Sequence, residues 1–456
     1  MKRFLQTNKR LLQCAAFVFL SFLLTSAGYL AWLYRLLELA PAGTAELLST
    51  GLGYAMQAAG LGAFAFTAHK RPVLVSAGPF FGLLAGFTAA AYVSAAVSGF
   101  GAALAFGIVA NLLCGGVAGF YLYALTENVP TNCRATVFGA AYALATVFSR
   151  LLSLPGNGFL RRAPGFGFIG ALLIVAIALL VLFAKPFFAP QQTLSAPEAE
   201  NRNAGFKLVI GAGAAMLLFS TVNHIGFAFP AADLANGVDL ETTRLCYAAG
   251  LLIAGFVNDK SRPHGAVLTL SALVIPFTVL ALRGQPVPAM VPWSLSYFAA
   301  GFFSVYRVTL FTDLAQQRRQ FFLSGCGLLF GRLGEALGTL TCFFAAGRTG
   351  VTAAISAALY VGTLFLFFRL YHKLYLPEAD REKQEKARFV RFSTQHDLSP
   401  REREILTLLL EQATTADIAR QLFVSESTVK FHVHNLLQKT GCKSRKELAE
   451  RYRSAR

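Results

Sequence analysis

The residues with the clearest potential for chemistry lie near the carboxy terminus, in a short helix predicted from Glu426 to about Thr440. Ser425 can cap the start of this helix, and Gly441 fits the left-handed position that ends many helices. The exposed face is predicted to carry hydroxyl, basic and aromatic side chains, namely Thr428, Lys430, Phe431, His434 and Lys439. Because an α-helix fits the major groove of DNA and its first turns reach the base edges, this pattern indicates a DNA-binding helix.

These side chains have chemistry suited to DNA. Lys430 can donate hydrogen bonds to O6 and N7 of guanine. Phe431 can contact a thymine methyl group, and packing sideways within the domain is an equally open alternative for it. Ser425 and Thr428 can hold a phosphate with their hydroxyls and backbone N–H groups, in addition to the capping role of Ser425. Lys439 is expected to meet the DNA backbone through its charge.

The segment around this helix has the pattern of a small four-helix domain over residues 398–456. Ser399 with Glu402 forms a capping box that begins a first helix, and Ser444 with Glu447 begins a fourth. Thr414 begins a second helix, and a tight turn joins it to the basic helix. Two short helices connected in this way, the second of them basic, form a helix-turn-helix unit.

The stretches LSPREREIL and DIARQLFVSESTVKFHVHNLLQKTGCKSRKELA strongly resemble the LuxR-type DNA-binding domain of bacterial transcription regulators. The resemblance implies binding to double-stranded DNA at promoter half-sites. It also implies a homodimer formed through the fourth helix, here Ser444 to Tyr452. His434 occupies a position at which this family often has a basic residue.

A second set of candidates, Arg307, Arg332 and Glu335, lies within apolar stretches. Ionisable residues at membrane depth are costly and are therefore functional candidates. Arg332 and Glu335 are three residues apart and share one face of a helix, where they can neutralise each other. We hypothesise that these residues line a central cavity for a small polar or anionic ligand. The alternative is an interior ion pair that only fixes the helix register.

The two sets of candidate residues lie in two regions of the chain that differ in composition. The 456-residue chain is 55% hydrophobic and only 14% charged, with a net charge of +18. Soluble globular proteins average about 25% charged residues, so this composition points to a membrane protein. Residues 1–375 consist of apolar stretches separated by short polar joints. Residues 376–397 read as a charged linker or a helical extension of the last span, with a solvated spacer favoured, and residues 398–456 read as the helical domain. The predicted fold is all-α, a polytopic transmembrane bundle followed by the DNA-binding domain.

About 12 membrane spans are predicted, given a hydrocarbon core about 30 Å thick. They cover residues 11–34, 46–67, 73–94, 101–125, 135–154, 167–188, 206–229, 243–257, 265–282, 290–311, 321–346 and 350–372. Basic residues concentrate in the joints that would be internal if the amino terminus were cytoplasmic. Both termini are therefore predicted to lie on the cytoplasmic side of the cell membrane.

Two similar joints, Ala68–Pro72 and Asn258–Pro263, lie six spans apart and suggest two six-helix halves. Gly255 through Arg262 resembles the inner-loop motif of the major facilitator superfamily, although the glycine expected before the closing basic residues is missing. This resemblance implies a transporter-like bundle. Glycine pairs spaced by four are expected to let helices approach closely, namely Gly82/Gly86, Gly327/Gly331 and Gly334/Gly338.

The leading functional prediction is a membrane-embedded transcription regulator whose bundle senses an unknown small molecule. The alternative is a secondary transporter of the major-facilitator type that carries a regulatory DNA-binding tail. Enzymatic activity is not expected, because neither part has a P-loop or a nucleophile motif. No cofactor or metal is expected either, since the 7 cysteines include no CxxC pair.

Overall fold

The computed structural model describes residues 9–152, 175, 178–179, 202–225, 227, 238–282, 287–345, 348–411 and 413–454. Within these ranges the regular secondary structure is helical, and no strand occurs in them. The chain divides into two compact units, Met1–Tyr371 (unit 1) and His372–Arg456 (unit 2).

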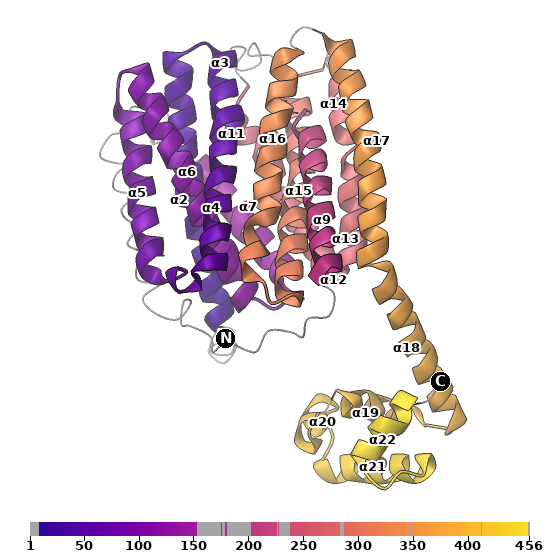
Figure 1. The fold of residues 1–456 in the computed structure, drawn as a ribbon. Coiled ribbons are helices and arrows are strands. Elements are labelled where there is room, and N and C mark those ends of the chain that lie inside the picture. The colour runs from indigo at the N-terminus through magenta and orange to yellow at the C-terminus, as the bar shows by residue number, and fades with distance from the viewer. Residues whose placement is uncertain are drawn as a thin grey trace. The chain divides into compact units, whose positions relative to one another are not determined.

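The first half of unit 1 consists of long apolar helices that run along a common direction (Figure 1). In chain order the elements are α2 (Lys9–Leu39), α3 (Ala42–Glu46), the π-helical η1 (Leu47–Gly53), α4 (Tyr54–Lys70), the 3₁₀ turn η2 (Pro72–Leu74), α5 (Ala77–Ala96), α6 (Phe100–Asn128) and α7 (Arg134–Leu152).

The second half of unit 1 contains both long and short helices. Its elements are α9 (Arg202–Ile225), α11 (Leu240–Thr243), α12 (Leu245–Lys260), α13 (Arg262–Ala272), α14 (Ile275–Leu282), α15 (Met290–Gln317), the 3₁₀ turn η3 (Phe321–Gly325), α16 (Cys326–Phe344) and α17 (Thr349–Leu374).

Each predicted span overlaps one or more helical elements, except 167–188, which lies outside the described residues apart from 175 and 178–179. The helices α2, α5, α6, α9 and α17 and the joined pair α13–α14 are each long and apolar enough to cross a membrane. The predicted span 265–282 is divided between α13 and α14. Pro276 explains this break, because it lacks an N–H group and its ring would clash with the carbonyl of Ala272. Unit 1 is a membrane-spanning helical bundle.

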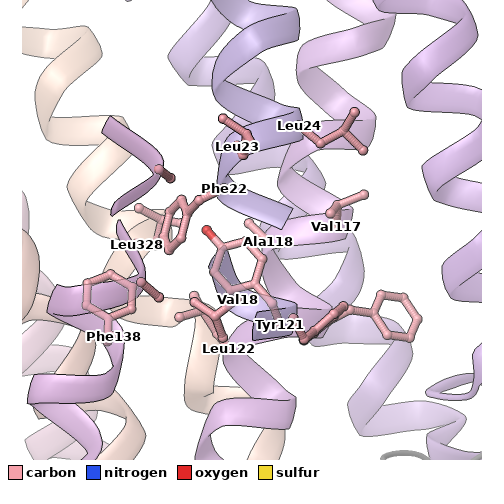
Figure 2. Packing of buried hydrophobic residues seen from close by; sticks show 14 of the residues in the cluster. Val18, Phe22, Leu23, Leu24, Val117, Ala118, Tyr121, Leu122, Phe138 and Leu328 are labelled. Atoms are coloured by element: carbon pink, nitrogen blue, oxygen red, sulfur yellow. The ribbon is translucent and has the colours of Figure 1, made fainter. Parts of the chain in front are cut away.

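The core of unit 1 combines aromatic and small side chains (Figure 2). The ring of Phe22 stacks on Tyr142 with centroids 4.0 Å apart and lies 4.8 Å from the ring of Tyr121. Leu328 of α16 belongs to the same cluster, although it is distant in sequence. Lipid tails are as apolar as these side chains, so close packing and hydrogen bonds between helices, not the hydrophobic effect, must hold the helices together.

Glycines permit the closest backbone approaches. A Cβ atom on Gly327 would lie 2.0 Å from the carbonyl oxygen of Arg307, and one on Gly334 would lie 2.3 Å from that of Leu217. The predicted close packing is therefore confirmed in α16. It is wrong at Gly82, where a Cβ would meet nothing within 4 Å because this residue is exposed on the outside of α5.

The two halves of unit 1 meet where α7 packs on α12 and where α4 packs on α16. At the first crossing a Cβ atom on Gly139 would lie 2.5 Å from the carbonyl oxygen of Leu251. One on Gly255 would lie 2.9 Å from that of Ala135. Larger residues at these two positions would push the halves apart.

Unit 2 is a small domain of short helices with a long one at its start. Its elements are α18 (Leu376–Gln395), α19 (Pro400–Leu410), α20 (Thr415–Gln421), α21 (Glu426–Thr440) and α22 (Arg445–Ser454). The predicted capping box of Ser399 and Glu402 is present, and Thr414 caps α20. Gly441 has a φ of 66°, the predicted left-handed conformation that ends α21.

Two apolar clusters hold unit 2 together. Val429 and Val433 of α21 pack with Ile405 and Ile418, which fixes α21 against α19 and α20. The second cluster includes Phe392 of α18, which is 2% exposed and lies 5.3 Å from the ring of Tyr452. The segment predicted as a charged linker is thus a helix whose last turns belong to the domain core. The many charged residues of this segment favoured the prediction of a spacer, although a few aromatic residues among them make this contact.

Candidate functional site

Hydroxyl side chains cluster at the amino-terminal end of α21 and cap it. Ser425 accepts a hydrogen bond from the backbone N–H of Thr428 at 3.1 Å, which satisfies one of the free donors of the first turn. The Ser425 hydroxyl is also 2.8 Å from that of Thr428 and 2.7 Å from that of Ser427. Both roles predicted for Ser425 are compatible with this geometry, since Ser425 remains exposed.

The outward face of α21 carries the side chains predicted to read DNA. Lys430 and His434 are exposed, and Phe431 is 60% exposed. The packing alternative for Phe431 therefore has little support in this domain. The structure adds Ser427, which is exposed and lies one turn before Lys430 and Phe431. Its spacing of three and four residues from them could have revealed it in the sequence.

Lys439 occupies a different position from the other candidates. Its ammonium donates to the backbone carbonyl of Asp397 at 2.8 Å and to the carboxylate of Glu402 at 2.9 Å. Burial opposes ionisation of Glu402, but the hydrogen bonds from Lys439 and from the Ser399 backbone outweigh it and lower the pKa of this carboxyl from 4.5. Lys439 thus ties the carboxy-terminal end of α21 to the start of α19. Its contact with a DNA phosphate stays a prediction.

A cavity of about 240 Å³ lies inside unit 1, between its two halves. All three membrane candidates, Arg307, Arg332 and Glu335, line it. The remaining wall is rich in aromatic side chains that sequence reasoning did not single out, including Tyr29, Tyr54, Tyr121, Tyr142, Tyr247, Trp293 and Phe303. They come from helices of both halves. Their spacing in the sequence does not distinguish the wall of a cavity from a packed core.

Three charged side chains of the cavity, those of Arg307, Arg332 and Glu335, form one cluster. Glu335 accepts a hydrogen bond from Nη1 of Arg332 through one carboxylate oxygen and from Nη1 of Arg307 through the other, each at 2.6 Å. The predicted pairing of Arg332 with Glu335 is confirmed. Arg307 joins it from α15, and a Cβ atom on Gly331 would lie 2.2 Å from its Nη1. Gly331 therefore makes room for this guanidinium.

Polar groups also connect the halves beside the cavity. His224 Nε2 lies 2.8 Å from the Thr339 hydroxyl, which donates to the hydroxyl of Thr50 at 2.9 Å. Thr50 belongs to the π-helical η1, and π-helical turns occur frequently at functional sites. Thr50 and His224 both line the cavity.

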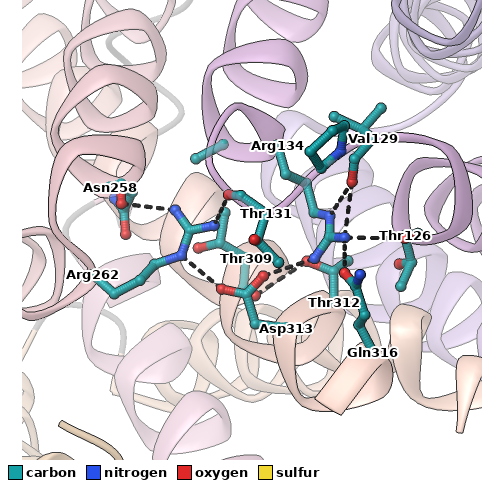
Figure 3. A network of polar contacts seen from close by, with 12 residues as sticks. Thr126, Val129, Thr131, Arg134, Asn258, Arg262, Thr309, Thr312, Asp313 and Gln316 are labelled. Atoms are coloured by element: carbon teal, nitrogen blue, oxygen red, sulfur yellow. Dashed lines mark hydrogen bonds and ion pairs between the residues drawn. The ribbon is translucent and has the colours of Figure 1, made fainter. Parts of the chain in front are cut away.

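A second polar cluster, the arginine–aspartate network, joins α7 to α15 and to the α12–α13 joint (Figure 3). The Asp313 carboxylate accepts from Nη1 of Arg134 at 2.8 Å and from Nε of Arg262 at 2.6 Å. Arg134 also donates to Gln316. Asp259 accepts from the backbone N–H groups of residues 135 and 136 and so caps the start of α7.

This network gives a structural role to the predicted inner-loop motif. Asp259 and Arg262 belong to that motif, and both bind partners in the first half of the bundle. Sequence reasoning missed Arg134 and Asp313 as members. Their signal was their place at the ends of apolar spans, but no spacing connects residues so far apart in the chain.

Comparison with known proteins identifies unit 2. Residues 396–451 match the model of a family described as bacterial regulatory proteins, luxR family. Over 56 residues the chain is 45% identical to the spore germination protein GerE of Bacillus subtilis (strain 168). This match covers 12% of this chain and 76% of GerE. The chain belongs to the luxR family of bacterial regulatory proteins.

A further relative is the nitrate/nitrite response regulator protein NarL of Escherichia coli (strain K12), 47% identical over 62 residues. That match covers 13% of this chain and 29% of NarL. The luxR-family likeness thus lies in the DNA-binding domain.

Solved structures resemble most of the chain in fold. The human organic anion transporter MFSD10 has a TM-score of 0.57 at 17% identity, over 79% of this chain and 99% of its own. The transporter FucP, of the major facilitator superfamily, has a TM-score of 0.54 at 14% identity, over 80% and 98% of the two chains. The predicted combination of a major-facilitator fold with a luxR-family DNA-binding domain is confirmed.

Proposed function

We propose that this luxR-family protein is a transcription regulator embedded in the cell membrane, whose bundle senses a small ligand. The observation that carries the proposal is the exposed basic and aromatic face of α21 in a chain that also holds a charged cavity. Lys430 and Phe431 would read base edges, while Ser425, Ser427 and Thr428 would hold a phosphate. Both termini would lie in the cytoplasm, where DNA is accessible.

Control requires a ligand that binds two conformations of the bundle unequally. Moving an equilibrium from 1:99 to 99:1 takes about 5.5 kcal/mol of differential binding. The arginine–aspartate network is suited to be the element that changes, because its bonds from Arg134 to Asp313 and from the start of α7 to Asp259 join the halves and would have to break for them to separate. The ligand would act through the cavity that both halves line.

A homodimer is part of this proposal. luxR-family domains use paired half-sites, and the fourth helix, α22, would form the contact between two copies. Leu448 of α22 is 1% exposed within one copy, so the dimer contact would use the exposed residues of α22 instead.

A secondary transporter with a regulatory tail is the second candidate, and the fold of the solved transporters favours it. Two experiments separate the candidates. Promoter occupancy should be mapped in cells with and without candidate solutes, and solute uptake should be measured in vesicles that contain residues 1–375. Ligand-dependent occupancy without uptake supports the regulator, whereas concentrative uptake supports the transporter. Occupancy that no solute changes would contradict the sensor role.

A further inference from the structure

The main charge cluster of the cavity is not neutral. Among the described residues that line the cavity, Arg307 and Arg332 share the single carboxylate of Glu335. This cluster carries one net positive charge in a membrane domain. Because an unpaired buried ion costs several kcal/mol, a cavity of this kind suits an anion better than a cation or a neutral molecule.

Both arginines of this cluster have an N–H group without an acceptor among the described residues. Arg307 is 3% exposed, and both it and Arg332 donate one Nη1–H to Glu335. The Nε atoms of both are buried and have no hydrogen-bond acceptor among the described residues. Arginine binds carboxylates through two parallel N–H···O bonds. The unused N–H groups are those that the carboxylate of a ligand would engage.

The aromatic part of the wall suits a flat apolar ring. The guanidinium of Arg332 lies 4.2 Å from the ring centroid of Tyr54, and that of Arg307 lies 5.0 Å from that of Phe303. The arginines are therefore held in place by aromatic faces. The volume of about 240 Å³ is below the usual range for drug-sized ligands, about 300–1,000 Å³, which favours a molecule with a single ring.

We propose that the cavity binds a small aromatic carboxylate, with its carboxylate on Arg307 and Arg332 and its ring against Tyr54 and the neighbouring aromatic side chains. The proposal rests on the sensor function above and narrows the ligand to one chemical class. Glu335 positions the two arginines and leaves one positive charge for the ligand.

The test uses the full chain in lipid nanodiscs and three probes that share one ring but differ in charge. Benzoate, benzyl alcohol and benzylamine are titrated by calorimetry, and acetate serves as a carboxylate without a ring. Benzoate should bind about tenfold more tightly than each of the others. Equal affinity for benzyl alcohol, or tighter binding of benzylamine, would overturn the proposal.

Variants locate the site. Arg332→Gln should weaken benzoate binding about tenfold or more, and Arg332→Lys should weaken it less, because it keeps the charge but loses the fork. Arg369→Gln, a matched change outside the cavity, should leave the affinity unchanged. If Arg332→Gln does not fold, the charge series on the unaltered chain still decides. Benzoate binding that never alters promoter occupancy would contradict the sensor function and leave this ligand class standing.

Discussion

At the scale of single residues, two lysines of α21 show how position decides function. Lys430 is exposed on the outward face, whereas Lys439 is bound to Glu402 and to the backbone of Asp397. The same side chain can therefore read DNA at one place and hold the domain together at another. Sequence spacing identified the outward face but not the partners of Lys439, because those partners come from another helix.

Lys430→Ala should weaken discrimination between the cognate site and a mutated site by about 1–3 kcal/mol, because it would remove the hydrogen bonds that we propose Lys430 donates to guanine. Binding titrations of unit 2 on both DNA fragments at one fixed salt concentration measure the change. Lys386→Ala removes an exposed charge of α18, outside α21 and α22, and serves as the control. It should leave the discrimination unchanged. Unaltered discrimination in Lys430→Ala would show that α21 enters the groove in another orientation.

Glu402 should make the stability of unit 2 depend on acidity. Its pKa is lowered in the folded domain, so its ionised form stabilises the fold above the ordinary value of 4.5. This contribution is lost as the pH falls from 4.5 through the folded pKa. Urea unfolding of unit 2 between neutral pH and pH 3 measures the loss, and Glu402→Gln should flatten this part of the curve. An identical curve for the variant would contradict the role of the Lys439 bond.

At the scale of elements, α18 packs into the core of unit 2, although its charged composition is typical of a solvated spacer. Phe389 and Phe392 lie against Tyr452 of α22, at centroid distances of 6.4 Å and 5.3 Å. The first helix of unit 2 is therefore part of the same core as the proposed dimer helix. A movement of α18 would reach α22 through packed rings, without a flexible linker between them.

Phe392→Ala should destabilise unit 2 by about 3–5 kcal/mol, because it removes a fully buried ring from the core. Phe389→Ala, at a half-buried position, should cost less. Chemical denaturation of unit 2 measures both. If α18 were a solvated spacer, neither change would alter the unfolding free energy.

Local signals in the sequence predicted most elements correctly. Caps, the left-handed Gly441 and the lengths of apolar runs are encoded by residues a few positions apart, so each could be identified from the sequence. Arg332 and Glu335 were predicted as a pair for the same reason. Arg307 lies on another helix, and the contact with Glu335 depends on how α15 and α16 pack, which no periodicity specifies. The aromatic side chains of the cavity wall and the partners of Asp313 could not be predicted either, because the packing of separate helices brings them together.

At the scale of the whole molecule, the bundle has two kinds of connection between its halves. Glycine contacts at α7 and α12 allow close approach and have no charge, so they favour packing in any state. The arginine–aspartate network depends on geometry, because Asp313 must reach two arginines from different segments. In the proposed sensor, a ligand in the cavity would change the second kind of connection without disrupting the first.

Asp313→Asn tests whether this network controls the DNA-binding domain. The change leaves the buried Arg134 without its carboxylate, and breaking a buried ion pair in this way costs about 3–5 kcal/mol. Thermal unfolding in nanodiscs should show the loss. Glu38→Gln, which breaks the partly exposed pair with Arg35, should cost at most about 1 kcal/mol. In cells, Asp313→Asn should alter promoter occupancy without ligand, while Glu38→Gln should not. A folded Asp313→Asn protein with unchanged occupancy would show that the state of the bundle does not govern the DNA-binding domain.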